Sequence, residues 1–228
     1  MEHLGKTSTI ARTREVRVNI GDDWLIGDLG VPAGATGIVV FAHGSGSGRM
    51  SPRNQFVAAA LDQRRLATLL IDLLTQDEEL VDRRTGHLRF NVRMLAERLV
   101  KIADWVHGDE ELNHLPIGLF GASTGGGAAL IAAAKRPERF GAVVSRGGRP
   151  DLAGSWLRHV LAPTLLIVGG RDEPVIQMNE QAMAQMHAEV RLEIVPGATH
   201  LFEEPGTLER VAALAGQWFE THLGGVRV

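Results

Sequence analysis

Residues 116–135 read PIGLFGASTGGGAALIAAAK, and this stretch decides the fold. The apolar run 116–120 has the composition of a strand that is buried on both faces, and it enters a glycine-rich turn at Gly121. An alanine-rich segment of helical character begins directly after that turn. Strand, tight turn and helix in immediate succession are typical of a parallel α/β sheet, in which functional turns lie at the carboxyl ends of the strands.

The rest of the chain repeats this alternation in both directions. Further strands are expected at residues 15–20, 24–31, 37–42, 67–73, 141–145, 163–168 and 190–195. Helices are expected at residues 52–65, 91–107, 124–136, 151–159, 174–187 and 207–222. Turn residues 21–23 predict that the first two strands form an antiparallel hairpin at a sheet edge. The sequence therefore predicts the α/β class: a mainly parallel, doubly wound sheet of about eight strands with helices on both faces, in a single domain over residues 1–228.

The composition excludes several kinds of protein. The 228 residues carry a formal net charge of −3, so there is no basic footprint for nucleic acid and no polybasic face for a membrane. No segment approaches the roughly 18 consecutive apolar residues of a membrane span. The absence of cysteine excludes disulfides, thiolate metal ligands and a cysteine nucleophile. Segment 1–15 lacks the apolar core of a signal peptide, and we expect a cytoplasmic protein.

Ser123 is the candidate nucleophile. It stands at the centre of the pattern G-x-S-x-G, between Gly121 and Gly125, at a junction of strand and helix. Glycines are needed there because side chains two residues to either side would collide in so tight a turn. One alternative is a turn that merely lets the helix pack closely on the strand. Another is a phosphate-binding loop at 125–127, but that run lacks a Lys-Ser/Thr ending and does not follow the first strand.

A serine hydroxyl needs a base, and the base is normally a histidine held by a carboxylate. Asp172 follows the strand expected at 163–168, and His200 follows the last expected strand, so both would lie at the same sheet edge as Ser123. The alternatives are an ordinary helix-capping role for Asp172, with Glu173 as its rival, and a surface loop role for His200. Among the other histidines only His43 also follows a buried strand.

The loop after the strand expected at 37–42 is a candidate for stabilising the negative charge that forms on the substrate oxygen when Ser123 attacks. An oxyanion hole is expected from the backbone N–H groups of Thr124, directly after Ser123, and of Ser45 in the loop His-Gly-Ser-Gly-Ser-Gly. His43 is expected to orient this loop, and His43 and Gly44 are candidate substrate contacts. The alternative is a flexible loop without a role. No histidine pair has metalloprotease spacing, and neither a metal nor a cofactor is expected.

Four motifs in this order resemble the α/β-hydrolase superfamily, and more narrowly its dienelactone-hydrolase-like branch. They are His43-Gly-Ser-Gly-Ser, Gly-Ala-Ser123-Thr-Gly-Gly-Gly, Gly-Gly-Arg-Asp172-Glu-Pro-Val and Gly-Ala-Thr-His200-Leu-Phe. The resemblance implies the α/β-hydrolase fold and a cofactor-free hydrolase that acts on esters or lactones. The chain departs from dienelactone hydrolases at the nucleophile, which is a cysteine in that family and Ser123 here.

These observations predict a serine hydrolase that cleaves small carboxylic esters through a Ser-His-Asp acyl-enzyme mechanism. A lactone, thioester or organophosphate remains an alternative substrate for the same three residues, and a non-catalytic small-molecule-binding protein is the alternative of another class.

Segment 146–162 is too short for a large cap domain, so an open site is expected. Arg146 is a weaker candidate for a substrate contact. The long loop Thr75–Phe90 either shapes the pocket or forms a solvated surface. The expected partner is a small ester-like molecule, with no nucleic acid or membrane, for a monomer or homodimer.

Overall fold

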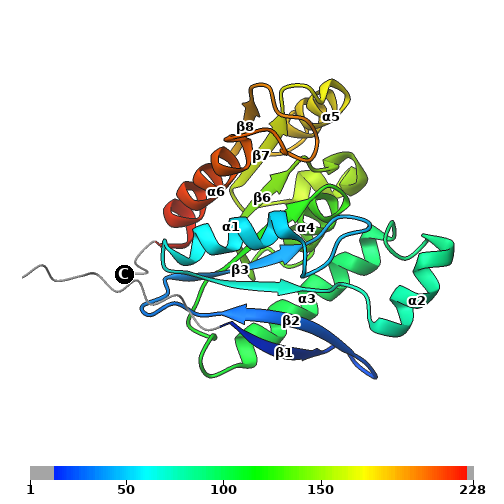
Figure 1. Ribbon diagram of the computed structural model, residues 1–228, viewed down its shortest axis with the longest axis vertical. Helices are drawn as coiled ribbons and strands as arrows, with labels where there is room; N and C mark the ends of the chain where they lie inside the picture. Colours follow the sequence, from blue (N-terminus) through cyan, green and yellow to red (C-terminus); the bar gives the residue numbers. More distant parts are fainter. Residues whose placement is uncertain (1–12, 225–228) are drawn as a thin grey trace, which may run out of the picture.

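The computed structural model describes residues 13–224, in which the strands form one eight-stranded sheet. The strands lie in the order β1-β2-β4-β3-β5-β6-β7-β8, which can be followed from bottom to top in Figure 1. Their bounds are β1 Arg14–Asn19, β2 Trp24–Gly30, β3 Gly37–Ala42, β4 Leu66–Ile71, β5 Ile117–Ala122, β6 Phe140–Arg146, β7 Thr164–Gly169 and β8 Val190–Val195. The predicted sheet of about eight strands is confirmed.

Strand direction also follows the prediction. The strands β1 and β2 form the antiparallel hairpin at one edge, and β2 pairs antiparallel with β4, whereas the strands from β3 to β8 pair in parallel. Every residue of β3, β4, β5 and β7 is buried, as their unbroken apolar sequences require of strands covered on both faces. The edge strand β8 is partly exposed and carries Arg191 and Glu193, which discourage pairing with another chain.

Helices cover both faces of the sheet. Helix α1 (Pro52–Asp62) and helix α6 (Thr207–Leu223) share one apolar core with their face of the sheet. The other face carries α3 (Val92–Gly108), α4 (Thr124–Lys135), the 3₁₀ helix η1 (Pro150–His159) and α5 (Glu173–Met183). None of the helices between residues 13 and 224 is both long enough and apolar enough to span a membrane. No cap domain is inserted into the part of the chain that the structure describes.

One predicted loop is a helix. Within Thr75–Phe90, residues Gln76–Thr85 form α2, which lies at the far side of the molecule from β8 (Figure 1). Its start is stabilised by a capping box, in which Thr75 and Glu78 each bind the other's backbone N–H through their side chains. The expectation of a loop was wrong because α2 buries only Asp82 and so lacks the apolar stripe by which a packed helix is recognised.

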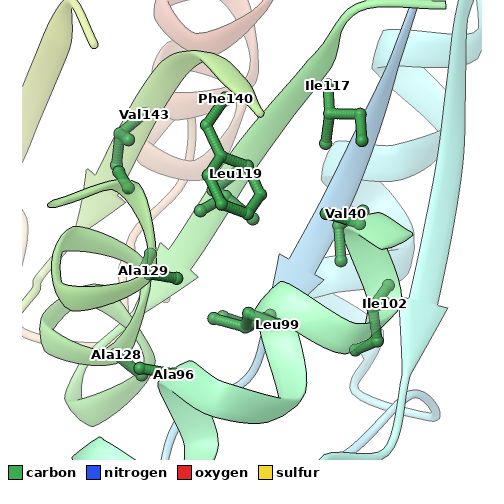
Figure 2. Close-up of a cluster of buried hydrophobic side chains, with 14 of the residues drawn as sticks. Val40, Ala96, Leu99, Ile102, Ile117, Leu119, Ala128, Ala129, Phe140 and Val143 are labelled. Atoms are coloured by element: carbon green, nitrogen blue, oxygen red, sulfur yellow. The ribbon is translucent and has the colours of Figure 1, made fainter. Parts of the chain in front are cut away.

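The larger apolar core lies between the sheet and helices α3 and α4. Figure 2 shows side chains of β3 and β5, among them Val40 and Leu119, on one side of this core and Leu99 and Ile102 of α3 on the other. All four side chains are fully shielded or nearly so, with at most 1% of their surface exposed. This packing fixes the strands, and with them the loops that leave their carboxyl ends.

The core makes a prediction about stability. We expect Leu99→Ala to lower the free energy of unfolding by about 2–5 kcal/mol, because it removes buried methyl groups and leaves a cavity. Leu161→Ala is the matched control, since Leu161 is 66% exposed and its truncation should change stability by less than about 0.5 kcal/mol. Urea unfolding of both variants measures the difference, and equal midpoints would show that the core is misassigned.

Candidate active site

Ser123 stands on a strained turn between β5 and α4. Its backbone has φ 50° and ψ −121°, a region that residues with a side chain rarely occupy. A Cβ atom at Gly121 would lie 2.6 Å from the Cα atom of Gly126, and one at Gly125 would overlap the carbonyl oxygen of Ala42. The glycines of the motif are therefore required by the close approach of α4 to the sheet, which holds the turn in its strained form.

The amino end of α4 surrounds Ser123 with backbone hydrogen-bonding groups. Thr124 is the first residue of α4, and its N–H has no hydrogen bond within residues 13–224. The neighbouring loop holds the turn from the other side, because the Ser123 N–H donates to the Arg146 carbonyl at 3.2 Å and the Arg149 N–H donates to the Ser123 carbonyl at 3.0 Å. The Ser123 side chain is half-buried, and the hydrogen bonds of its backbone N–H and carbonyl fix the position from which it extends.

Asp172 and His200 are in direct contact. Asp172 follows β7 and His200 follows β8, and the histidine Nδ1 lies 2.6 Å from the aspartate Oδ2. An ionised carboxylate can only accept a hydrogen bond, so the proton is on Nδ1 and the lone pair is on Nε2. In this tautomer the histidine can accept a proton through Nε2, which is the arrangement that a general base requires.

Backbone contacts join the two loops that carry these residues. The Arg171 N–H donates to the Ala198 carbonyl at 2.9 Å, one residue before Asp172 and two before His200. The Thr199 N–H donates to Glu204 Oε2 at 3.0 Å, and this hydrogen bond holds the pKa of Glu204 below its ordinary value. The contact between the carboxylate and the imidazole therefore depends on two loops that are tied to each other.

His200 packs against Gly147, next to the residue that binds the Ser123 N–H. A Cβ atom at Gly147 would lie 3.4 Å from His200 Cε1, and Gly147 directly follows Arg146, whose carbonyl binds the Ser123 N–H. Within residues 13–224 no hydrogen bond joins Ser123 Oγ to His200 Nε2. Such bonds are often long in unliganded enzymes and shorten when substrate binds. Ser123, Asp172 and His200 thus all follow strands at one edge of the sheet, and the structure shows the contact between Asp172 and His200.

The candidate oxyanion loop differs from the prediction in one respect. Ser45 and Thr124 are adjacent as expected, but the Ser45 N–H donates to the hydroxyl Oγ1 of Thr124 at 3.0 Å. Gly44 allows this approach, because a Cβ atom there would lie 3.1 Å from Ser123 Cβ. For the Ser45 N–H to hold a substrate oxygen, that oxygen must displace the threonine hydroxyl. The Thr124 N–H needs no such exchange.

His43 is bonded on both sides of its ring. Its Nε2 accepts the Leu73 N–H at 2.9 Å, and its Nδ1 donates to the Gly44 carbonyl at 3.0 Å. Burial lowers the pKa of His43 from its ordinary value of 6.5. These contacts connect the candidate oxyanion loop to the end of β4 and leave neither ring nitrogen for proton transfer with a substrate.

A residue that the sequence analysis did not single out also holds this loop. The Arg49 side chain bonds Asp28 at 2.6 Å and Asp72 at 3.2 Å, and the Arg49 N–H donates to Asp72 Oδ1 at 2.8 Å. The sequence signal that could have revealed this contact was the position of Asp72 directly after β4, at the same sheet edge as the other site residues.

An open groove of about 1000 Å³ adjoins the loop, and residues of α2, among them Leu80 and Arg83, form part of its wall.

Comparison with known proteins agrees with this architecture. A family described as "Alpha/beta hydrolase domain" matches residues 35–213. The crystal structure of a dienelactone hydrolase from Anabaena variabilis is 61% identical, superposes with a TM-score of 0.92, and the match covers 93% of this chain and 99% of that one. The esterase domain of a Rhodothermus marinus protein shares the fold alone, with 19% identity, a TM-score of 0.74 and coverage of 93% and 100%.

Curated relatives give a different kind of match. Two Mycobacterium tuberculosis proteins, from different strains, are each 54% identical over 214 residues and carry the provisional name phosphoribosyl transferase. The match covers 94% of this chain but only 47% of theirs, so the chain spans about half the length of these relatives. The family match over residues 35–213 and the 61% identity to a protein of nearly the same extent show that the chain belongs to the α/β-hydrolase family, in its dienelactone-hydrolase-like branch.

Proposed function

We propose that this protein is a serine hydrolase of small carboxylic esters, with Ser123, His200 and Asp172 as its catalytic residues. The observation that carries the proposal is the 2.6 Å contact between His200 Nδ1 and Asp172 Oδ2, formed at the sheet edge where Ser123 stands on its strained turn. A surface histidine or a helix-capping aspartate does not require this pairing. The esterase and dienelactone hydrolase names among the structural relatives support the same reaction class.

The proposed reaction is acyl transfer in two steps. His200 accepts the hydroxyl proton of Ser123 through Nε2 while the serine oxygen attacks the ester carbonyl, and the protonated imidazole then donates that proton to the leaving alcohol. Water, deprotonated by His200, next attacks the acyl carbonyl; the bond to Ser123 Oγ breaks, the acid leaves, and His200 returns the proton to the serine oxygen. Asp172 keeps the proton on Nδ1 and stabilises the imidazolium that forms. The backbone N–H of Thr124 stabilises the negative charge on the carbonyl oxygen.

In this proposal the Ser45 N–H is the second donor to the oxyanion, and it exchanges the Thr124 hydroxyl for the substrate oxygen. In the free enzyme its N–H binds the Thr124 hydroxyl at 3.0 Å, so the donor is already turned toward the first residue of α4. An oxyanion is a stronger acceptor than a neutral hydroxyl, and charge-assisted hydrogen bonds are about twice as strong as neutral ones. The exchange therefore favours the transition state over the ground state, which is the condition for catalysis.

The provisional name of the curated relatives points to another reaction, the transfer of a phosphoribosyl group. That name belongs to proteins of which this chain matches 47%. The strained Ser123 and the contact between Asp172 and His200 have no role in such a transfer, so the hydrolase proposal accounts for the described site better. Hydrolysis rates on a panel of 4-nitrophenyl esters, lactones, thioesters and organophosphates would show which of these substrate classes the enzyme prefers.

The nucleophile can be tested directly. We expect Ser123→Ala to lower kcat on a short 4-nitrophenyl ester by about 10⁴–10⁶-fold, because the acyl-enzyme can no longer form. The same substitution should abolish labelling by a fluorophosphonate, which reacts with activated serines. Ser155→Ala is the control, since Ser155 is exposed on η1. A wild-type protein that neither reacts with the probe nor hydrolyses any of these substrates would favour a binding protein instead.

The role of His43 predicts a pH dependence of stability. Burial keeps the pKa of His43 below 6.5 in the folded protein, whereas the unfolded chain binds a proton near that value. The unfolded state thus holds more protons between the two values, so the free energy of unfolding falls as the pH drops below about 6.5. Urea unfolding at pH 8 and pH 5 should show a smaller loss in His43→Gln than in the wild type.

His114→Gln is the matched control for this measurement, because His114 is exposed. It should keep the wild-type pH dependence. If the wild type and His43→Gln lost the same free energy of unfolding between pH 8 and pH 5, the neutral imidazole of His43 would not be what holds the loop.

A further inference from the structure

Asn179 is a polar residue in the buried stripe of α5. The buried residues of this helix are Val175, Asn179 and Ala182, which share one helix face, and Asn179 is fully shielded from solvent. Its Oδ1 atom has no hydrogen-bond partner within residues 13–224. An unsatisfied amide oxygen in the interior costs free energy, so packing alone would favour a leucine at this position. The presence of the amide must therefore be explained by what its nitrogen binds.

The Asn179 Nδ2 group donates to a carbonyl close to the nucleophile. It lies 3.1 Å from the Gly148 carbonyl oxygen and 2.7 Å from that of Val175, one turn earlier in α5. Gly148 is tightly confined, since a Cβ atom there would lie 1.8 Å from Ser145 Oγ. Asn179 thus ties α5 to the short connection between β6 and η1, which also contacts the Ser123 turn.

Two peptide units connect Asn179 to the proposed oxyanion donor. The Gly148 carbonyl and the Arg149 N–H belong to one peptide unit, and in a trans peptide these two groups point in opposite directions. The Arg149 N–H donates to the Ser123 carbonyl at 3.0 Å. That carbonyl shares its own peptide unit with the Thr124 N–H, which points the opposite way. Side chain, first peptide and second peptide therefore form one hydrogen-bonded chain from α5 to the proposed reaction centre.

A chain of this kind fixes and strengthens its last donor. Each hydrogen bond that a peptide carbonyl accepts polarises the N–H of the same unit, and this cooperative strengthening amounts to about 10–30% per bond. The chain also fixes the planes of both peptide units, so the Thr124 N–H needs no reorientation when charge forms on the substrate. The Gly126 N–H donates to the same Ser123 carbonyl at 3.0 Å, so α4 and the Asn179 chain hold that carbonyl together.

We propose that Asn179 is a positioning residue for the oxyanion hole, which acts through the Gly148–Arg149 peptide on the Thr124 N–H. This inference rests on the proposed hydrolase function. Asn179 touches neither the substrate nor the reacting atoms, and its contribution grows as the carbonyl oxygen becomes negative in the transition state. Its loss therefore lowers kcat and leaves KM nearly unchanged.

The kinetic test compares a short 4-nitrophenyl ester with the thionoester in which sulfur replaces the carbonyl oxygen. Sulfur accepts hydrogen bonds weakly, so the attack on the thionoester gains less from the oxyanion donors. We expect Asn179→Leu to lower kcat on the ester by about 10-fold, less than the loss of a whole donor, because Gly126 still holds the Ser123 carbonyl. Activity on the thionoester should fall less, so the ratio of ester to thionoester activity should fall severalfold.

Gln177→Leu is the matched control, because Gln177 is exposed on the same helix and loses the same amide group. It should keep the wild-type kcat and the wild-type ratio. Asn179→Ala removes the same donor without requiring a new side chain to fit, and it should lower the ratio as well. A purely structural role of Asn179 would lower the Tm of either variant but leave the ratio unchanged, and that result would overturn the proposal.

Amide chemical shifts test the chain apart from catalysis. The shift of an amide nitrogen responds to hydrogen bonding at the carbonyl of the same peptide unit, so the Arg149 and Thr124 signals should both move upfield in Asn179→Leu. Gln177→Leu should leave both in place. An unmoved Thr124 signal would overturn the proposal even if kcat falls.

The two measurements also separate this inference from the proposed function. If the wild type hydrolyses no ester but both amide signals still depend on Asn179, the hydrolase function fails and the hydrogen-bonded chain stands. If esters are hydrolysed and neither the amide signals nor the substrate ratio depends on Asn179, the positioning role fails alone.

Discussion

The strained backbone at Ser123 is the constraint on which the rest of the site depends. A positive φ at a residue with a side chain costs free energy, and here the close contact of α4 with β3 and β5 maintains it. That contact requires Gly121 and Gly125, because no larger residue fits between the helix and the strands. The same contact brings the amino end of α4 to the loop at Ser45, so one packing requirement positions both the proposed nucleophile and its proposed oxyanion donors.

The second requirement is that two loops from neighbouring strands meet. Because β7 and β8 are parallel, their carboxyl ends share one edge, and backbone hydrogen bonds such as that from Arg171 to Ala198 tie the loops together. Asp172 and His200 then meet without long or flexible connections. Gly147 has φ 51° and lies against His200, so a side chain there would contact the imidazole. The site is thus built from strand ends, with little contribution from the helices beyond α4.

Much of this arrangement could be predicted from the sequence, because it follows from strand order and from residues placed directly after apolar runs. The helix at Gln76–Thr85 could not be predicted from periodicity, since it buries almost nothing, although the capping box of Thr75 and Glu78 was a visible signal. The Ser45 N–H was assigned to an oxyanion, and its present bond to the Thr124 hydroxyl depends on a side-chain rotamer that no pattern encodes. The lack of a partner for Arg146 Nε and Nη1 within residues 13–224 likewise depends on which chain segments fold over the end of β6.

Several unfavourable features of the described residues lie at the carboxyl edge of the sheet. Ser123 and Phe202 both have positive φ values, and Arg146 is buried at the end of β6 with Nε and Nη1 unpartnered within residues 13–224. Selection for stability alone would replace each of these residues, because a substitution could relieve the strained backbone or remove the buried charge. Ser123 and Phe202 lie at the same sheet edge as the contacting pair Asp172 and His200, and the proposed hydrolase function would account for their retention. The apolar cores on the two faces of the sheet supply the stability that lets this edge remain strained.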